Sequence, residues 1–212
     1  IGPHLATGKE PGAPWDRMVL REVGDLADFV AVHTYYIGLT GRDRRAENGP
    51  GNIDRIMRAC MAVGQQAHSR LDDYRALIRQ ETGREIPLAV TEYNAGFVQQ
   101  KPLPLRFTFG AGLMAADYLR TMIEMSDALE LANYWQYHHG YWGMLRKHGV
   151  TSDGWPEYRK TPAFYLYRVF NDHLGTTRLD VDIASPVREF EGYAKALPAR
   201  TGRTDEQSVT LD

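Results

Sequence analysis

The sequence has almost no cysteine, no long apolar run and no excess of charge, and each shortage excludes a class of protein. The single cysteine, Cys60, excludes an internal disulfide, and its apolar neighbours at helical spacing predict a buried structural thiol. No apolar stretch approaches the ~18 residues of a membrane span. The formal net charge of −2 gives no basic surface for nucleic acid or anionic lipid. We therefore expect a globular protein with no nucleic-acid and no membrane partner.

A secretory signal is also missing from the first residues, and the chain does not begin with Met. We expect the sequence to begin inside a longer protein, so its start says little about location; a cytoplasmic location is slightly favoured over secretion. The length of 212 residues fits one domain, or one domain with a fragment of another. Aromatic residues are the one mild excess, and several of them crowd into one loop.

Three apolar runs of strand length stand out, and helical patterns separate them. The runs are Asp28–His33, Ile86–Glu92 and Leu129–Trp135. The helical patterns cover about 15–24, 52–77 with Gly83 as a C-terminal cap, 105–125, and 161–175 with Thr161 as N-cap and Pro162 after it. Strands that alternate with long helical crossovers form a parallel sheet covered by helices.

A doubly wound sheet and a piece of a (β/α)₈ barrel both fit this order of elements. No glycine-rich phosphate loop follows any of the strands, which weakens the nucleotide-binding version. Beyond Gly175 the sequence changes to Leu179–Ile183 and a polar tail, which looks like the opening of an all-β module.

Polar and aromatic residues stand at the ends of the three expected strands. These residues are His33 and Tyr35, then Glu92 and Asn94, then Trp135 and Gln136. In a parallel βα barrel the active site lies at the carboxyl ends of the strands. A carboxylate, a histidine, amides and aromatic rings are the groups a sugar site needs, because hydroxyls take paired donors and acceptors while the apolar sugar face stacks on a ring.

The same motifs resemble family 51 α-L-arabinofuranosidases, which are retaining glycosidases on (β/α)₈ barrels. The resemblance is carried by His33-Thr-Tyr35, Thr91-Glu-Tyr-Asn94 and Asn133-Tyr-Trp-Gln136, in that order and spacing. The closing helix from Thr161 and the stretch Val181–Pro186 look like the family's exit into a C-terminal β-sandwich. The resemblance thus implies a partial (β/α)₈ (TIM) barrel of about strands five or six to eight over residues 1–175, and the start of a truncated all-β domain over 176–212.

The resemblance also implies a role for each strand-end residue. Glu92 matches the catalytic nucleophile on the seventh strand. His33 and Tyr35 match sixth-strand residues near that carboxylate, and Gln136 matches an eighth-strand residue that contacts the sugar. We also expect Asn94 and Trp135 to contact substrate, although packing of the barrel mouth is an open alternative for both. The family's acid/base Glu follows an Asn on the fourth strand, and no such pair is present here.

The expected function is that of a retaining glycoside hydrolase that releases terminal α-L-arabinofuranosyl residues from arabinose-containing poly- and oligosaccharides. The alternatives are another glycosidase of the same clan, such as a β-xylosidase or endoglucanase, and a non-catalytic carbohydrate-binding barrel. The expected partner is a carbohydrate; no cofactor is expected, and a homo-oligomer of the complete protein is left open.

The segment Tyr137–Arg159 is expected to be a long aromatic loop that stacks on sugar, forms a self-packed lid or meets another subunit. It contains His138 and His139, but no carboxylate or cysteine stands at ligand spacing, so no metal is expected. Counting gives three strands, or four if Ile1–Pro3 ends another. A part-barrel has open edges, and we expect it to expose interior residues, namely Val30, Val32, Leu88 and Val90. The isolated chain is therefore expected to be inactive and to associate or fold poorly.

Overall fold

The structure is a computed structural model that describes residues 2–5, 11–36, 60–61, 63–95, 105–140, 142–177, 179, 188–189 and 210–211. In chain order the elements are α1 (Pro14–Val23), η1 (Gly24–Leu26), β1 (Val30–Tyr36), α4 (Val63–Thr82), β2 (Leu88–Ala95), η2 (Leu105–Phe107), α5 (Phe109–Glu124), β3 (Leu129–Tyr134), β4 (Leu145–Val150), β5 (Pro156–Lys160), α6 (Pro162–His173), β6 (Arg188–Glu189) and β7 (Thr210–Leu211). The predicted alternation of helices and strands is confirmed. The start of the second helix, expected at residue 52, lies outside the described residues.

The main sheet is parallel and has the order β1-β2-β3. A further segment at the start of the chain lines up with the free edge of β1. His4 pairs in parallel with Ala31, whose N–H donates to the Pro3 carbonyl at 2.8 Å and whose carbonyl accepts from the Leu5 N–H at 3.0 Å. The parallel sheet with helical crossovers agrees with part of a barrel, whereas the eight-strand count and the C-terminal sandwich stay predictions.

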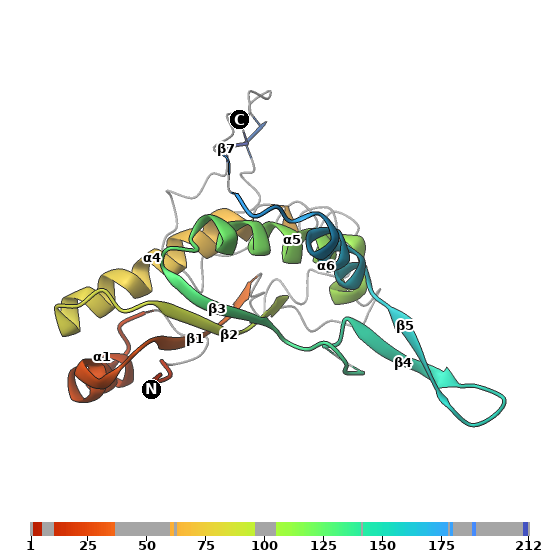
Figure 1. Cartoon of the computed structure of the whole chain (residues 1–212), viewed down its shortest axis with the longest axis horizontal. Helices are drawn as coiled ribbons and strands as arrows, with labels where there is room; N and C mark the ends of the chain where they lie inside the picture. The colour runs from red at the N-terminus through yellow and green to blue at the C-terminus, as the bar shows by residue number, and fades with distance from the viewer. Residues whose placement is uncertain are drawn as a thin grey trace.

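Helices α4, α5 and α6 lie together over one face of this sheet (Figure 1). The main core lies between that face and the helices, where Val30 and Leu88 pack in one cluster with Leu71 of α4 and Tyr118 of α5. This corrects the expectation that the apolar strand residues fill a barrel interior. The four residues in question are at most 1% exposed and belong to this helix-side core: Val30, Val32, Leu88 and Val90.

The predicted capping residues at the helix ends are confirmed in part. Thr161 is the N-cap residue of α6 and Pro162 follows it, but the Thr161 hydroxyl makes no capping bond and the helix ends at His173, two residues before Gly175. Gly83 has a φ of 68°, a left-handed conformation that suits glycine after a helix. Cys60 is fully buried as predicted, and burial raises the pKa of its thiol to about 12.

The expected loop Tyr137–Arg159 is instead largely a β-hairpin. Strands β4 and β5 pair antiparallel and project from the body of the molecule beyond β3 (Figure 1). The turn between them is closed by hydrogen bonds between Thr151 and Trp155, and Gly154 has a φ of 86°. Near the end of the chain, β6 and β7 form a two-residue antiparallel pair. Within the described part of the chain, no helix is both long and apolar enough to cross a membrane.

Candidate active site at the ends of the strands

The two faces of β1 have different neighbours. Val30 and Val32 belong to the core beneath the helices, and the Thr34 hydroxyl meets the hydroxyl of Tyr118 on α5. Because side chains alternate along a strand, His33 and Tyr35 point to the opposite face. Both are partly exposed. The face of β1 opposite the core under α4 and α5 therefore presents a histidine and a tyrosine at its carboxyl end.

A bulge in β2 brings Glu92 to the same face. In a regular strand Glu92 would share the helix side with Val90, two residues earlier. The pairing with β1 instead passes from Val32↔Val90 to His33↔Glu92, which leaves Thr91 as an extra residue. This one-residue shift places Glu92 beside His33. Bulges commonly re-aim a side chain in this way next to active sites.

The contacts of Glu92 converge on one of its two carboxylate oxygens. The Tyr35 hydroxyl donates to Oε2 at 2.5 Å, and Nδ1 of His33 lies 3.4 Å from the same atom. Among the described residues Oε1 makes no hydrogen bond. The Glu92 side chain is 22% exposed, so one oxygen is held while the carboxylate remains accessible. This is an arrangement suited to a nucleophile.

The electrostatics keep Tyr35 and His33 in defined protonation states. Burial, followed by the hydrogen bond to Glu92, raises the pKa of the Tyr35 hydroxyl, which therefore stays protonated and donates. Burial also lowers the pKa of His33. His4 lowers it further, because its ring lies 4.1 Å from that of His33, while the Glu92 carboxylate opposes both effects. A neutral His33 is therefore favoured near neutral pH.

Asn94 lies next along β2 but is buried, with 4% exposure. Its Nδ2 donates to the carbonyl of Trp135 and, at 3.2 Å, to the carbonyl of Trp142. Its Oδ1 accepts from the Tyr134 hydroxyl at 3.2 Å and from the Ala95 N–H at 2.7 Å. The structure therefore ties Asn94 to the residues that follow β3, and its contact with substrate stays a prediction.

Trp135 and Gln136 come directly after β3, and both are partly exposed. The Trp135 N–H donates to the Tyr93 carbonyl at 3.1 Å, and the peptide bond between Trp135 and Gln136 is cis. The carbonyl of Gln136 accepts from the Met144 N–H at 3.0 Å, while its side-chain amide makes no hydrogen bond to the described residues. Its expected contact with the sugar stays a prediction.

Two residues lie at this site that the sequence did not single out as site residues, His4 and Trp142. His4 reaches it through the segment paired with β1, and no motif marks that pairing. Trp142 belongs to the aromatic segment after β3, and its ring centroid lies 5.7 Å from that of Tyr35. The guanidinium of the buried Arg106 lies over the same indole, 4.3 Å from its centroid. The excess of aromatic residues in that segment was the signal for Trp142.

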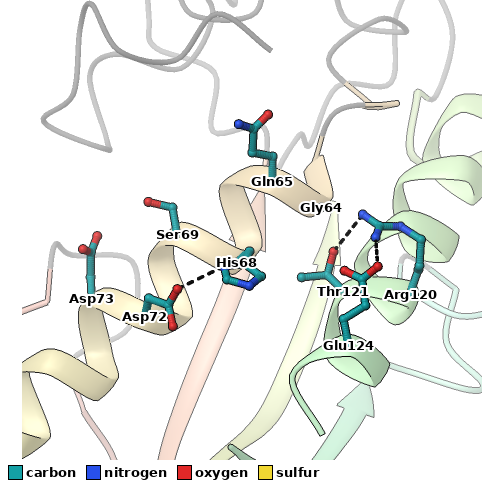
Figure 2. Close-up of a pocket in the computed structure, with 9 residues that line it drawn as sticks. All are labelled: Gly64, Gln65, His68, Ser69, Asp72, Asp73, Arg120, Thr121 and Glu124. Carbon is teal, nitrogen blue, oxygen red and sulfur yellow. Dashed lines mark hydrogen bonds and ion pairs between the residues drawn. The ribbon is translucent and has the colours of Figure 1, made fainter. Parts of the chain in front are cut away.

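A separate concave region of about 540 Å³ lies between α4 and α5 (Figure 2). Among its polar side chains, His68 lies 3.0 Å from Asp72, and Arg120 pairs with Glu124. None of the strand-end residues lines it. In the part of the chain that the structure describes, no group of three side chains is arranged to hold a metal ion.

Parallel strands covered by helices on one face, with a carboxylate, a tyrosine and a histidine at their carboxyl ends, agree with part of a βα barrel. No family model and no curated protein sequence matches this chain. Solved structures do match. The fold is similar to a family 51 α-L-arabinofuranosidase from Bifidobacterium longum, with a TM-score of 0.62 and 15% identity over 88% of this chain and 40% of that one.

Two further arabinofuranosidase structures have the same fold. One, from Xanthomonas axonopodis pv. citri, has a TM-score of 0.52 and 14% identity over 80% of this chain and 33% of that one. The other, from Thermotoga maritima and solved with arabinose, has a TM-score of 0.50 and 22% identity over 76% of this chain and 30% of that one. This chain thus spans about a third of the length of the structures it matches. The structural comparison confirms the resemblance to family 51 enzymes at the level of the fold.

Proposed function

We propose that this chain is the nucleophile-bearing part of a retaining glycoside hydrolase of family 51, and that the complete protein releases terminal α-L-arabinofuranosyl residues. The observation that carries the proposal is the placement of Glu92. It stands at the end of β2 with one oxygen held by Tyr35 at 2.5 Å, and His33 lies 3.4 Å from the same oxygen. The fold shared with arabinofuranosidases supports the choice of sugar.

In the proposed reaction, Oε1 of Glu92 attacks the anomeric carbon while the bond to the leaving oxygen breaks with its electron pair. A second carboxyl group protonates that oxygen and then removes a proton from the water that hydrolyses the glycosyl ester. Retention places the two carboxyl groups about 5–5.5 Å apart. We propose that the second carboxyl comes from outside these 212 residues, because the sequence has no Asn-Glu pair at a strand end.

The other residues receive supporting roles. Tyr35 holds Oε2 and orients the carboxylate, and the neutral His33 donates to the same oxygen or to a sugar hydroxyl. Trp135 and Gln136 are proposed to contact the sugar. Residues 1–175 would belong to the barrel and 176–212 to an all-β domain, for which the pairing of β6 with β7 is the support.

The test is hydrolysis of an aryl α-L-arabinofuranoside by the complete protein, with the product followed by NMR. We expect retention of configuration, and a loss of turnover of roughly 10⁴-fold or more for Glu92→Gln with sugar binding largely kept. Glu85→Gln is the matched control, because Glu85 is exposed and pairs with Arg79 before β2. Inversion, or a near-normal rate for Glu92→Gln, would contradict the proposal. Cleavage of an aryl xyloside or glucoside alone would favour another glycosidase of the clan, and binding without cleavage a carbohydrate-binding barrel.

A further inference from the structure

Trp142 contacts Tyr35, the tyrosine that is hydrogen-bonded to the candidate nucleophile Glu92. Its ring centroid lies 5.7 Å from that of Tyr35, with the planes tilted by 57°, and the Tyr35 hydroxyl donates to Glu92. The Arg106 guanidinium lies over the Trp142 indole, 4.3 Å from its centroid. Trp142 as a whole residue is partly exposed. An aromatic ring beside a sugar-processing carboxylate is suited to the apolar C–H face of a sugar.

The backbone of Trp142 is held on both sides. Its N–H donates to Nδ1 of His139 at 3.1 Å, and its carbonyl accepts from Asn94 at 3.2 Å. The neighbouring Gly143 N–H donates to the His139 carbonyl at 3.0 Å. A Cβ on Gly143 would lie 2.3 Å from the His139 backbone nitrogen, so only glycine fits this close turn. These bonds tie the backbone of Trp142 and Gly143 to His139 and to Asn94 of β2.

Asn94 is the residue that connects this segment to β2. A side-chain amide has two N–H donors and one oxygen with two lone pairs. In Asn94 both donors face carbonyls, of Trp135 and Trp142, and the oxygen accepts from Tyr134 and from the backbone of Ala95. Its hydrogen-bonding capacity is used inside the protein, which leaves none for a sugar hydroxyl.

We propose that Trp142 forms an apolar wall of the sugar site beside Tyr35, and that Asn94 is a positioning residue that holds this wall in place and does not bind the sugar itself. The ligand class is a pyranose or furanose ring that presents its C–H face to the indole while Glu92 faces its anomeric carbon. This inference rests on the proposed function, in which Glu92 attacks a sugar.

The test compares Trp142→Ala, Trp142→Phe and Asn94→Ala in the complete protein, with an aryl arabinofuranoside as substrate and free arabinose as ligand. For Trp142→Ala we expect KM for the arabinofuranoside and Kd for arabinose to rise about tenfold, with kcat changed less. Trp142→Phe keeps a flat ring and should stay within about threefold of wild type. Asn94→Ala should reproduce the rise seen in Trp142→Ala.

A double variant separates positioning from binding. If Asn94 acts through Trp142, then Asn94→Ala together with Trp142→Ala raises KM no more than Trp142→Ala alone. Tyr134→Phe is the matched control, because it removes one bond to Oδ1 and keeps both bonds from Nδ2. Trp142→Ala tests the wall without changing Asn94, so it decides that part of the proposal even if Asn94→Ala fails to fold.

The outcomes separate this inference from the function it rests on. If Glu92→Gln abolishes hydrolysis but Trp142→Ala leaves KM and arabinose binding unchanged, the wall is disproved and the glycosidase assignment stands. If the double variant raises KM by the product of the two single increases, the positioning role of Asn94 is disproved. A normal rate for Glu92→Gln would defeat the proposed function whatever Trp142 does.

Discussion

The central strand β2 and the edge strand β3 have similarly apolar sequences but very different surroundings. β2 is paired on both sides, and its residues Leu88 and Val90 are fully buried. Among the described residues β3 is paired on one side, and Leu131 in its middle is 39% exposed. The difference teaches that neighbours, more than residue type, decide burial here. The site residues differ in the same way. Backbone pairing of β2 with β1 places Glu92, whereas the residues after β3 are held by side-chain hydrogen bonds such as those of Asn94.

The largest expected effect is on stability. We expect Leu88→Ala to lower the free energy of unfolding by about 3 kcal/mol, because it leaves a cavity in the core under the helices. Leu131→Ala should cost less than about 1 kcal/mol, since its side chain already meets solvent. Urea unfolding followed by circular dichroism measures both. Equal losses would show that the two strands are packed alike, which would contradict the different burial of Leu88 and Leu131.

Tyr35→Phe tests the hydrogen bond by which Tyr35, at the end of β1, orients Glu92. The variant removes a hydrogen bond to a carboxylate, which is worth about 1.5–3 kcal/mol and corresponds to a fall in kcat of roughly 10- to 100-fold. Tyr165→Phe is the control, because this tyrosine is 54% exposed on α6. A kcat within twofold of wild type would remove Tyr35 from the machinery.

The edge of β3 that has no partner in the described part of the chain predicts self-association of the 212-residue chain. An unpaired strand edge offers backbone donors and acceptors to another chain, and a charged side chain on it opposes such pairing. We expect the isolated chain to elute as associated species and Leu131→Lys to shift the profile toward monomer. Leu174→Lys, at an exposed position after α6, should leave the profile unchanged. A wild-type chain that is monodisperse, monomeric and active would contradict this expectation.

The smallest effect concerns pH. The folded pKa of His33 lies below its ordinary value of 6.5, so the unfolded chain binds more protons between the two values. The contribution of His33 to stability is thus fully present above pH 6.5 and is lost as the pH falls through the lowered pKa. NMR titration should show a still lower pKa in Glu92→Gln, since the carboxylate opposes the shift. A higher pKa in that variant would contradict the assigned contacts.

The sequence predicted the strands and the order of helices well, because buried parallel strands and amphipathic helices leave continuous and periodic apolar patterns. It did not predict which face of each strand is the core. Alternation alone cannot tell the helix side from the barrel interior when both are apolar, so Val30 and Leu88 were assigned to the wrong side. The hairpin β4–β5 was missed because its strands are polar and largely exposed.

The strand-end residues were found from their positions, but their geometry was not. The extra residue Thr91 turns Glu92 toward His33, and no local signal distinguishes a bulge from a regular strand in Ala-Val-Thr-Glu. The contact of His4 with His33 joins segments that only the folded sheet brings together. The ties made by Asn94 likewise link β2 to residues some 40 to 50 positions later.

The most direct test of the central claim is covalent trapping of Glu92. A fluorinated arabinofuranoside with a dinitrophenolate leaving group needs no general acid to depart, and the fluorine slows hydrolysis of the glycosyl ester. After incubation with the complete protein, mass spectrometry of the digest should find one fluoroarabinosyl group on the peptide that contains Glu92, and none in Glu92→Gln. Labelling of a different carboxylate, or release of dinitrophenolate with inversion and no labelled peptide, would contradict the account.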